Sequence, residues 1–292
     1  MLKTLNVSIL LVLVVSVCAN ALERIVPFAV STPNIDGILS SGEWSIALHV
    51  PIVYPDITTS PNNGGFSGPA PEDANDLSAD CYLMWDNDRL YFAAQVYDAT
   101  VVWSALLDPN NLQDAVQLGF NPRNETGNWN GSRAATIFSF VAQTSDSAGP
   151  QYYSKNHNTS YGQSGVVNMS GSVTSDGYII EGSINWDQIG GVPAFGDTKG
   201  ATIILSDADS DPDLDKTYLA DSSNIINSVN TIDNMDYWNK LRFIAADGCG
   251  TGALATSDID KDCMINFKDF ASLAETWVLC TSPVDTNCAR AN

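Results

Sequence analysis

The chain has few positively charged residues. Its 292 residues include 13 Lys and Arg against 34 Asp and Glu, which gives a formal net charge of −21. A chain of this charge repels phosphate backbones and anionic lipid surfaces, so nucleic acid and charged membranes are not expected partners. After the N-terminal segment no apolar run is long enough for a membrane span. The same charge suits an exported protein that binds cations such as calcium.

Catalytic signals are also scarce. The two histidines are His49, in an alternating segment that predicts a strand, and His157, in a polar loop. No nucleophile elbow, zinc-protease helix or phosphate-binding loop occurs. Glycoside hydrolysis needs two carboxylates that face each other across a cleft, and sequence cannot reveal such a pair. No catalytic residue is therefore assigned, and a secreted glycoside hydrolase is kept as the alternative function.

The N-terminus has the pattern of a secretory signal peptide over residues 1–21. Lys3 precedes an apolar run over 9–17, and Ala-Asn-Ala at 19–21 provides a small-residue cleavage site. The prediction is a secreted, extracellular protein that folds in an oxidising compartment.

Residues 22–246 form the predicted body, and their patterning is that of an all-β domain. Segments 80–85 and 90–97 alternate in polarity around the turn at 86–88, which predicts a hairpin. One face of its second strand carries Leu90, Phe92, Ala94 and Val96. Further strands are predicted at 24–30, 45–53, 113–121, 134–143, 165–174, 178–184, 201–206 and 240–245. Helical patterning is limited to short turns near 40–44 and 186–189, so an antiparallel β-sandwich is expected.

A twelve-residue stretch near the C-terminus has the spacing of a calcium loop of the EF-hand kind. Oxygen ligands fall at loop positions 1, 3, 5, 9 and 12, with a backbone carbonyl at position 7. Cys263 replaces the usual glycine and an aspartate replaces the closing glutamate. The predicted ligands are Asp258, Asp260, Asp262, Met264, Asn266 and Asp269. The alternative is an acidic loop that alternates by chance.

An amphipathic helix is predicted after this loop. Its apolar face comprises Phe267, Phe270, Leu273, Ala274, Trp277 and Val278. The glycine-rich segment 248–252 precludes a matching helix before the loop. Loop and helix together, over 258–277, resemble one repeat of a type I dockerin. The resemblance implies a calcium-binding tail over 247–292 and a cohesin-like protein partner, although known dockerins carry two such repeats and one is found here.

Four cysteines lie in this tail, as expected for a core-poor segment in an oxidising compartment. Pairing Cys249 with Cys263 and Cys280 with Cys288 is one of three possible disulfide connectivities. A zinc site built from the four thiolates is the competing interpretation, although no pair has CxxC spacing. Cys81, in the body, is predicted to be a buried free thiol.

Several ordered motifs of the body resemble carbohydrate-binding module family 9. They are Ile-Asp-Gly-Ile-Leu at 35–39 with Glu43 and Trp44, the hairpin at 84–98, Gln-Asp-Ala-Val-Gln-Leu-Gly-Phe at 113–120, Gly-Tyr-Ile-Ile-Glu-Gly-Ser-Ile-Asn-Trp at 177–186, Leu-Ser-Asp-Ala-Asp at 205–209 and Trp-Asn-Lys-Leu-Arg-Phe at 238–243. The resemblance spans about 33–245. It implies a β-sandwich, often attached to secreted glycoside hydrolases, that holds the end of a sugar chain between two tryptophans.

The positions that correspond to the family's sugar contacts differ here. Leu112 stands where the resemblance places one stacking tryptophan, Gln117 replaces an acidic ligand residue, and no aromatic stands in register near 231–235. Other aromatics could supply the apolar platform on which a sugar ring stacks. The candidate ligand residues are Trp103, Trp129, Gln117 and Trp238. For the aromatic ones, ordinary core packing is the competing role.

The predicted function is that of a secreted, non-catalytic protein that binds polysaccharide or oligosaccharide and attaches through its calcium-dependent tail, in polysaccharide recognition or degradation. A structural assembly module without sugar binding is a further alternative.

A second acidic run alternates over 207–215. An extended strand would place Asp207, Asp209, Asp211, Asp213 and Asp215 on one side, where their charges repel unless a cation or solvent screens them. A calcium site and a solvated loop are both consistent with this pattern.

Overall fold

The computed structural model describes residues 23–53, 58–59, 73–102, 114–127, 135–142, 151–154, 167–208, 216–221, 234–245 and 270–271. Of the calcium-loop segment and the helix predicted after it, only Phe270 and Ala271 fall in these ranges, and both are helical and exposed. The predicted signal peptide, Trp103, Trp129, the six tail ligands and the four tail cysteines lie outside the described residues. No helix among the described residues is both long and apolar enough to cross a membrane.

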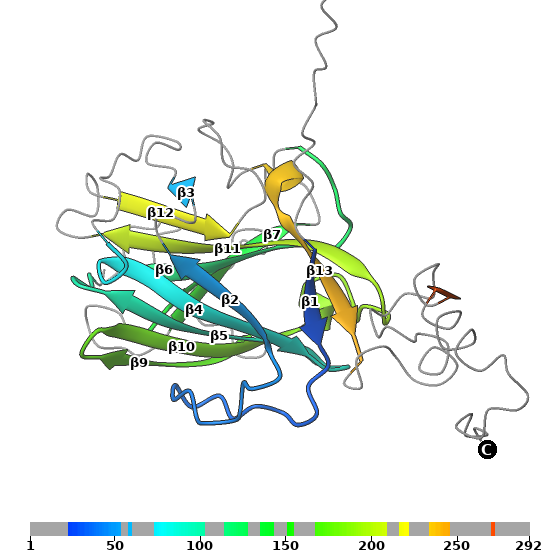
Figure 1. The fold of residues 1–292 in the computed structure, drawn as a ribbon, viewed down its shortest axis with the longest axis horizontal. Helices are drawn as coiled ribbons and strands as arrows, with labels where there is room; N and C mark the ends of the chain where they lie inside the picture. The colour runs from blue at the N-terminus through cyan, green and yellow to red at the C-terminus, as the bar shows by residue number, and fades with distance from the viewer. Residues whose placement is uncertain are drawn as a thin grey trace, which may run out of the picture.

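Two sheets are stacked face to face as a β-sandwich, and Figure 1 shows them as an upper and a lower layer. The eight-stranded sheet has the order β1-β13-β11-β6-β7-β8, with β12 paired to β11 and β3 paired to β12. Its strands are β1 (Glu23–Pro27), β3 (Thr58–Thr59), β6 (Ala115–Asn121), β7 (Thr136–Val141), β8 (Gln151–Ser154), β11 (Thr198–Ala208), β12 (Lys216–Asp221) and β13 (Asn239–Ile244).

The five-stranded sheet has the order β2-β4-β5-β10-β9, and all its neighbours are antiparallel. Its strands are β2 (Leu48–Val53), β4 (Leu77–Trp85), β5 (Arg89–Asp98), β9 (Val167–Thr174) and β10 (Gly177–Asn185). Two short 3-10 turns complete the described elements, η1 (Trp186–Gln188) and η2 (Met235–Tyr237). The all-β prediction is therefore confirmed for the body.

Alternate residues of the strands fill the space between the sheets, because successive side chains of a strand point to opposite faces. The hairpin prediction is confirmed: β4 pairs with β5, and the predicted apolar face of β5 lies in the main core. Cys81 is buried there as predicted, and burial raises the pKa of its thiol, which keeps it protonated and unreactive.

The outer face of the five-stranded sheet is covered by the chain between β1 and β2. Figure 1 shows this connection running beneath the lower layer. It contributes Ala29 and Trp44 to a second apolar cluster with Met84, Tyr91 and Ala93. Because this connection covers the outer face of the sheet, β5 can carry apolar residues on both of its faces.

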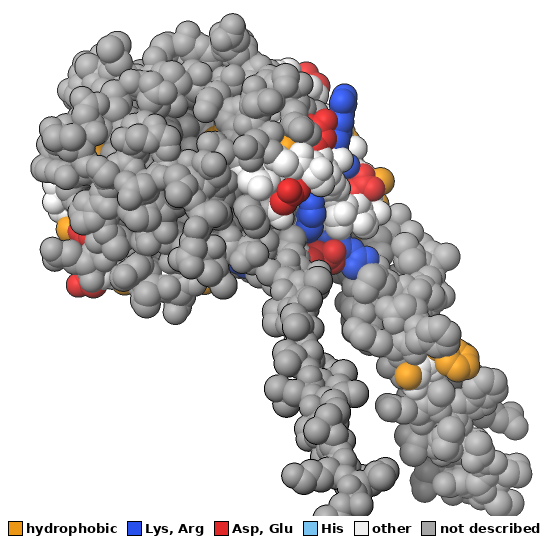
Figure 2. All heavy atoms as spheres, turned by 90° about the horizontal axis from the view of Figure 1, so that it is seen from above, with side chains coloured by type: hydrophobic (Ala, Val, Ile, Leu, Met, Phe, Trp, Pro, Cys, Tyr) orange, Lys and Arg blue, Asp and Glu red, His pale blue; other side chains and the backbone are white. Residues whose placement is uncertain are grey.

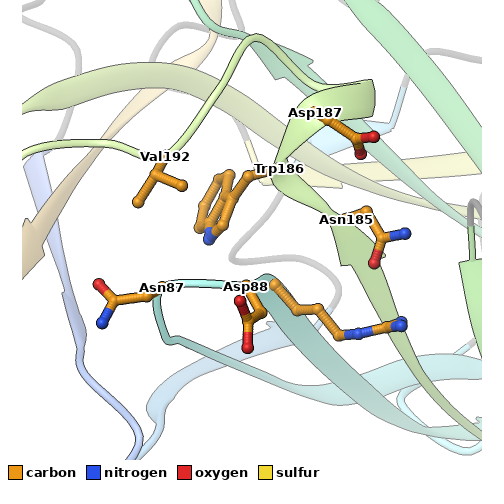
Figure 3. Close-up of a pocket in the computed structure, with 7 residues that line it drawn as sticks. Asn87, Asp88, Asn185, Trp186, Asp187 and Val192 are labelled. Atoms are coloured by element: carbon orange, nitrogen blue, oxygen red, sulfur yellow. The ribbon is translucent and has the colours of Figure 1, made fainter.

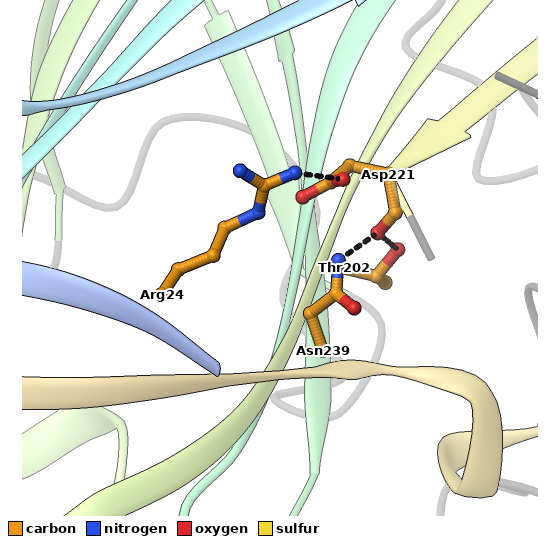
Figure 4. A network of polar contacts seen from close by, with 4 residues as sticks. All are labelled: Arg24, Thr202, Asp221 and Asn239. Carbon is orange, nitrogen blue, oxygen red and sulfur yellow. Dashed lines mark hydrogen bonds and ion pairs between the residues drawn. The ribbon is translucent and has the colours of Figure 1, made fainter. Parts of the chain in front are cut away.

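A polar network joins four strands of the upper layer at its β1 edge (Figure 4). Arg24 Nη2 lies 2.6 Å from Asp221 Oδ1, which links β1 to the end of β12. The backbone carbonyl of Asp221 accepts hydrogen bonds from Thr202 Oγ1 at 3.1 Å and Asn239 Nδ2 at 3.3 Å. The network fixes β1 beside β13 in the one parallel pairing among the described strands.

Two further ion pairs of this layer are partly exposed. Seen from above in Figure 2, acidic and basic side chains lie next to one another on the described surface. Arg242 Nη1 is 3.6 Å from Glu23 Oε1, and Lys199 Nζ is 3.4 Å from Asp197 Oδ2. Solvent screens pairs of this kind, so each contributes little to stability.

Every strand expected in the body is present, with ends that differ by a few residues. Strands β3, β8 and β12 were not expected. Each is short or lies in polar sequence, so alternation alone does not distinguish it from a loop. The short turns expected near 40–44 and 186–189 are also found, as a turn at 41–46 and as η1.

Candidate functional site

The first candidate site lies on the outer face of the eight-stranded sheet, around Gln117. Gln117 is in β6, where it pairs with Ser139 of β7 and Ile204 of β11. The residue is only 4% exposed, and its Nε2 atom is buried without a hydrogen-bond partner. A buried amide donor without a partner costs about 1–3 kcal/mol. Such a donor is a position where a ligand or a water molecule could supply the missing acceptor.

Trp238, a second predicted ligand residue, directly follows η2 and lies on the same face, over Gly119, which is two positions after Gln117 in β6. A Cβ atom at Gly119 would lie 2.7 Å from Thr202 Cγ2 and 2.9 Å from the Trp238 ring, so the indole rests directly on the sheet. Trp238 has no exposed surface and packs with Ala135, Ile137 and Met235. The structure thus brings Gln117 and Trp238 onto one face, with Trp238 in a packing role.

The second candidate site is a group of three buried carboxylates between the two sheets. Asp98 ends β5, Asp114 precedes β6 and Asp207 lies near the end of β11, and one oxygen of each lies within 4.8 Å of the others. Asp114 accepts hydrogen bonds from the backbone N–H of Val102 and from that of Ala208 at 2.7 Å. Carboxylate oxygens are the ligands that calcium prefers, so this group could hold a divalent cation with further oxygens from backbone or water.

The electrostatics of this group follow from burial and like charge. Burial raises the pKa of Asp114 well above its ordinary value, and the charge of Asp98 raises it further. The hydroxyl of Tyr178, buried nearby in β10, has its pKa raised by burial and then by the charge of Asp114. Without a cation, protonation of one carboxyl relieves the repulsion between the three carboxylates at the lowest cost in free energy.

Sequence reasoning identified Asp207 as part of an acidic run but not its two partners. Asp98 ends β5 and Asp114 precedes β6, in separate sequence motifs. Only the stacking of the two sheets brings these residues together. Asp209, Asp211, Asp213 and Asp215 lie outside the described residues, as does Leu112. Asp207, the one aspartate of this run that the structure describes, is buried between the sheets rather than solvated.

We expect the metal-free protein to lose stability as the pH rises above about 4. A carboxyl whose folded pKa lies above its unfolded value binds more protons when folded, so raising the pH costs folding free energy. Replacing Asp98 by Asn removes the neighbouring charge and should make the decline shallower, with a gain of about 1–2 kcal/mol at pH 7 in EDTA. Urea unfolding from pH 4 to pH 8 measures the slope.

The matched control is Asp187→Asn, which neutralises an exposed aspartate of η1. It should leave the slope of the wild type unchanged. Equal slopes for the wild type and Asp98→Asn would show that Asp98 does not influence the titration of this group.

Comparisons with known proteins agree with the observed fold. The family model described as Carbohydrate family 9 binding domain-like matches residues 52–231. A carbohydrate binding module family 9 from Caldicellulosiruptor kristjanssonii in complex with cellotriose is 17% identical, with a TM-score of 0.51 over 76% of this chain and 94% of that one. A carbohydrate binding module family 9 from the same organism in complex with glucose gives the same identity and TM-score, over 76% of this chain and 96% of that one. No curated protein matches this chain.

Proposed function

Since the chain belongs to the carbohydrate family 9 binding domain-like proteins, we propose that it is a secreted, non-catalytic protein that binds polysaccharide or oligosaccharide. The similar modules from Caldicellulosiruptor kristjanssonii hold cellotriose and glucose, which makes β-linked glucose chains the first ligands to test. The proposal includes a C-terminal tail that attaches the protein to a partner in a calcium-dependent way.

The observation that carries sugar binding is the unpartnered amide of Gln117. Sugar hydroxyls accept and donate hydrogen bonds, so a hydroxyl at Nε2 would satisfy a donor that the fold leaves without an acceptor. Gln117 also occupies the position that the resemblance assigns to a polar sugar contact. Trp103 and Trp129 remain the predicted stacking residues. Gln117 and Trp238 are both buried, so ligand contact at either one requires the groups that cover it to move.

Titration calorimetry of the full chain with cellotriose tests this proposal. We expect binding to the wild type, and Gln117→Met should weaken the Kd about five- to ten-fold by removing one hydrogen bond. Methionine has a similar volume and leaves no unpartnered donor, so thermal stability should be unchanged or slightly higher. Gln95→Met makes the same exchange on the other sheet and should bind like the wild type.

Failure of cellotriose and of a broader glycan panel to bind the wild type would refute sugar binding. Release of glucose during the titration would instead support the glycoside hydrolase alternative. Equal affinity of the wild type and Gln117→Met would remove Gln117 from the site.

The attachment function rests on the calcium loop of the tail, predicted from its ligand spacing. Asp258, Asp260, Asp262, Met264, Asn266 and Asp269 are the proposed ligands. The oxygen of a neutral asparagine binds calcium more weakly than a carboxylate. The double variant Asp258→Asn, Asp260→Asn should therefore lose at least about a hundred-fold in calcium affinity, and with it the pull-down of a cohesin-like protein.

Calcium titration of metal-stripped protein measures this effect. The double variant Asp209→Asn, Asp211→Asn is the matched control, because it removes the same charge from the other acidic run. Loss of calcium heat in the control alone would assign the ion to that run and overturn the proposed tail site.

A further inference from the structure

A polar hollow of about 460 Å³ lies beside the turn between β4 and β5, in the lower sheet (Figure 3). Its walls are Asn87, Asp88, Arg89, Asn185, Asp187 and Val192. Figure 3 shows the Trp186 indole between Val192 and the turn residues. The volume of the hollow lies within the range of small-molecule sites, about 300–1,000 Å³. Gln117 lies in the other sheet, so this hollow is separate from the site discussed above.

The hollow is rigid because Asp86 and Trp186 lock its two walls together. Asp86 Oδ1 accepts hydrogen bonds from the backbone N–H of Asp88 and Arg89, both at 2.8 Å, and Oδ2 accepts one from Tyr91 at 2.6 Å. Trp186 Nε1 donates to the carbonyl of Asp86 at 2.7 Å. A ligand would therefore meet polar groups that are already in place, which lowers the entropic cost of binding.

Backbone hydrogen bonds also hold the wall that residues 185–192 form. The backbone N–H of Trp186 donates to the carbonyl of Asp88 at 3.2 Å, and the N–H of Gly191 donates to the carbonyl of Trp186 at 2.7 Å. Arg89 Nη1 donates to Ser183 Oγ at 3.0 Å, which leaves further N–H groups of the guanidinium for a ligand.

The groups around the hollow suit a neutral ligand with several hydroxyls. Asn87 and Asn185 can each donate and accept, Arg89 donates, and Asp88 and Asp187 accept. One positive and two negative side chains leave the walls negative, which disfavours phosphates and acidic sugars. Val192, 52% exposed, offers an apolar surface for the C–H face of a ring.

We propose that this hollow is a second carbohydrate site that takes one unit of a neutral sugar. The assignment rests on the proposed function for its choice of sugar class, while its geometry is independent of Gln117. Trp186 is only 2% exposed and cannot stack on a ring. Binding is therefore weak, in the millimolar range, and suits a subsite that extends contact with a longer chain.

Nuclear magnetic resonance of the full chain tests the proposal with glucose and cellotriose as probes. The backbone N–H signals of residues 87–89 and 185–192 should shift in a saturable way, together with the indole signal of Trp186. The double variant Asn87→Ala, Asp187→Ala should weaken the Kd at these signals about ten-fold or more. Both side chains are exposed, and neither makes a hydrogen bond to a described residue, so the fold should be retained.

Asp176→Ala is the control, because this exposed residue lies at the opposite end of β10 from Asn185. It should bind like the wild type. Absence of shifts at the hollow with either sugar would overturn the assignment, as would equal shifts with glycerol or in the double variant. Shifts at the hollow without shifts near Gln117 would keep this site and refute the first one, whereas the reverse pattern would do the opposite.

Discussion

Replacing Glu181 by Ala is expected to lower the free energy of unfolding by about 3–5 kcal/mol. Glu181 has no exposed surface, and its Oε2 atom accepts hydrogen bonds from three consecutive backbone N–H groups. These belong to Asp36, Gly37 and Ile38, at 3.1, 2.8 and 3.2 Å. Its Oε1 atom accepts a fourth from Trp44 Nε1 at 2.9 Å. Alanine would remove the carboxylate acceptor from all four donors, of which the Ile38 N–H alone keeps a second acceptor, Asp36 Oδ1 at 3.0 Å.

Urea unfolding at neutral pH measures this loss. Glu181→Gln should cost less than Glu181→Ala, because the amide keeps one acceptor oxygen of nearly the same shape. The control is Glu23→Ala, which breaks the partly exposed, 3.6 Å pair with Arg242 and should cost less than about 1 kcal/mol. A cost at Glu181→Ala as small as that of the control would mean that the chain between β1 and β2 is not held by this carboxylate.

Replacing Gly177 by Ala is expected to cost about 3 kcal/mol or more, or to prevent folding. Gly177 begins β10 with φ at +137°, and an added Cβ would lie 2.2 Å from the carbonyl oxygen of Val96 and 3.0 Å from the amide nitrogen of Asp98. Both atoms belong to the backbone of β5, so neither can move without disturbing the pairing of β5 with β10. Thermal and urea unfolding report the loss.

Gly42→Ala separates the close approach from the backbone angle. Gly42 also has a positive φ, +89°, but no atom lies within 4 Å of an added Cβ. This control should cost only about 1 kcal/mol, from the backbone conformation alone. Equal costs at the two glycines would show that the contact with Val96 is relieved without strain.

The alternation of polar and apolar residues was enough to predict most of the local structure. The β4–β5 hairpin follows from the turn residues at 86–88 and from alternate apolar side chains, and these chains do face the core. Glu181 and Trp44 stand in separate sequence motifs. Their hydrogen bond joins residues 137 positions apart, which no local pattern reveals.

Burial of the outer face of β6 was not evident from sequence. Gln117 alternates with Val116 and Leu118, so a single strand predicts a solvated face for it, whereas the structure buries both faces. On this face Gly119 of β6 itself and Ile204 of the neighbouring β11 are small or apolar, and Trp238 packs over Gly119, so the face is covered rather than solvated. The same tertiary contacts place Trp238 against Gly119, whereas its sequence context alone left both ligand contact and core packing open.

The all-β class, the hairpin, the inward faces of the strands and the burial of Cys81 were encoded locally, because side-chain period and turn chemistry act over a few neighbouring residues. Strand order, the parallel β1–β13 pair, the meeting of Asp98 with Asp114 and Asp207, and the hollow beside Trp186 were decided only in three dimensions. Each of these depends on which distant strands lie side by side, and that choice is set by the packing of the whole core rather than by any one segment.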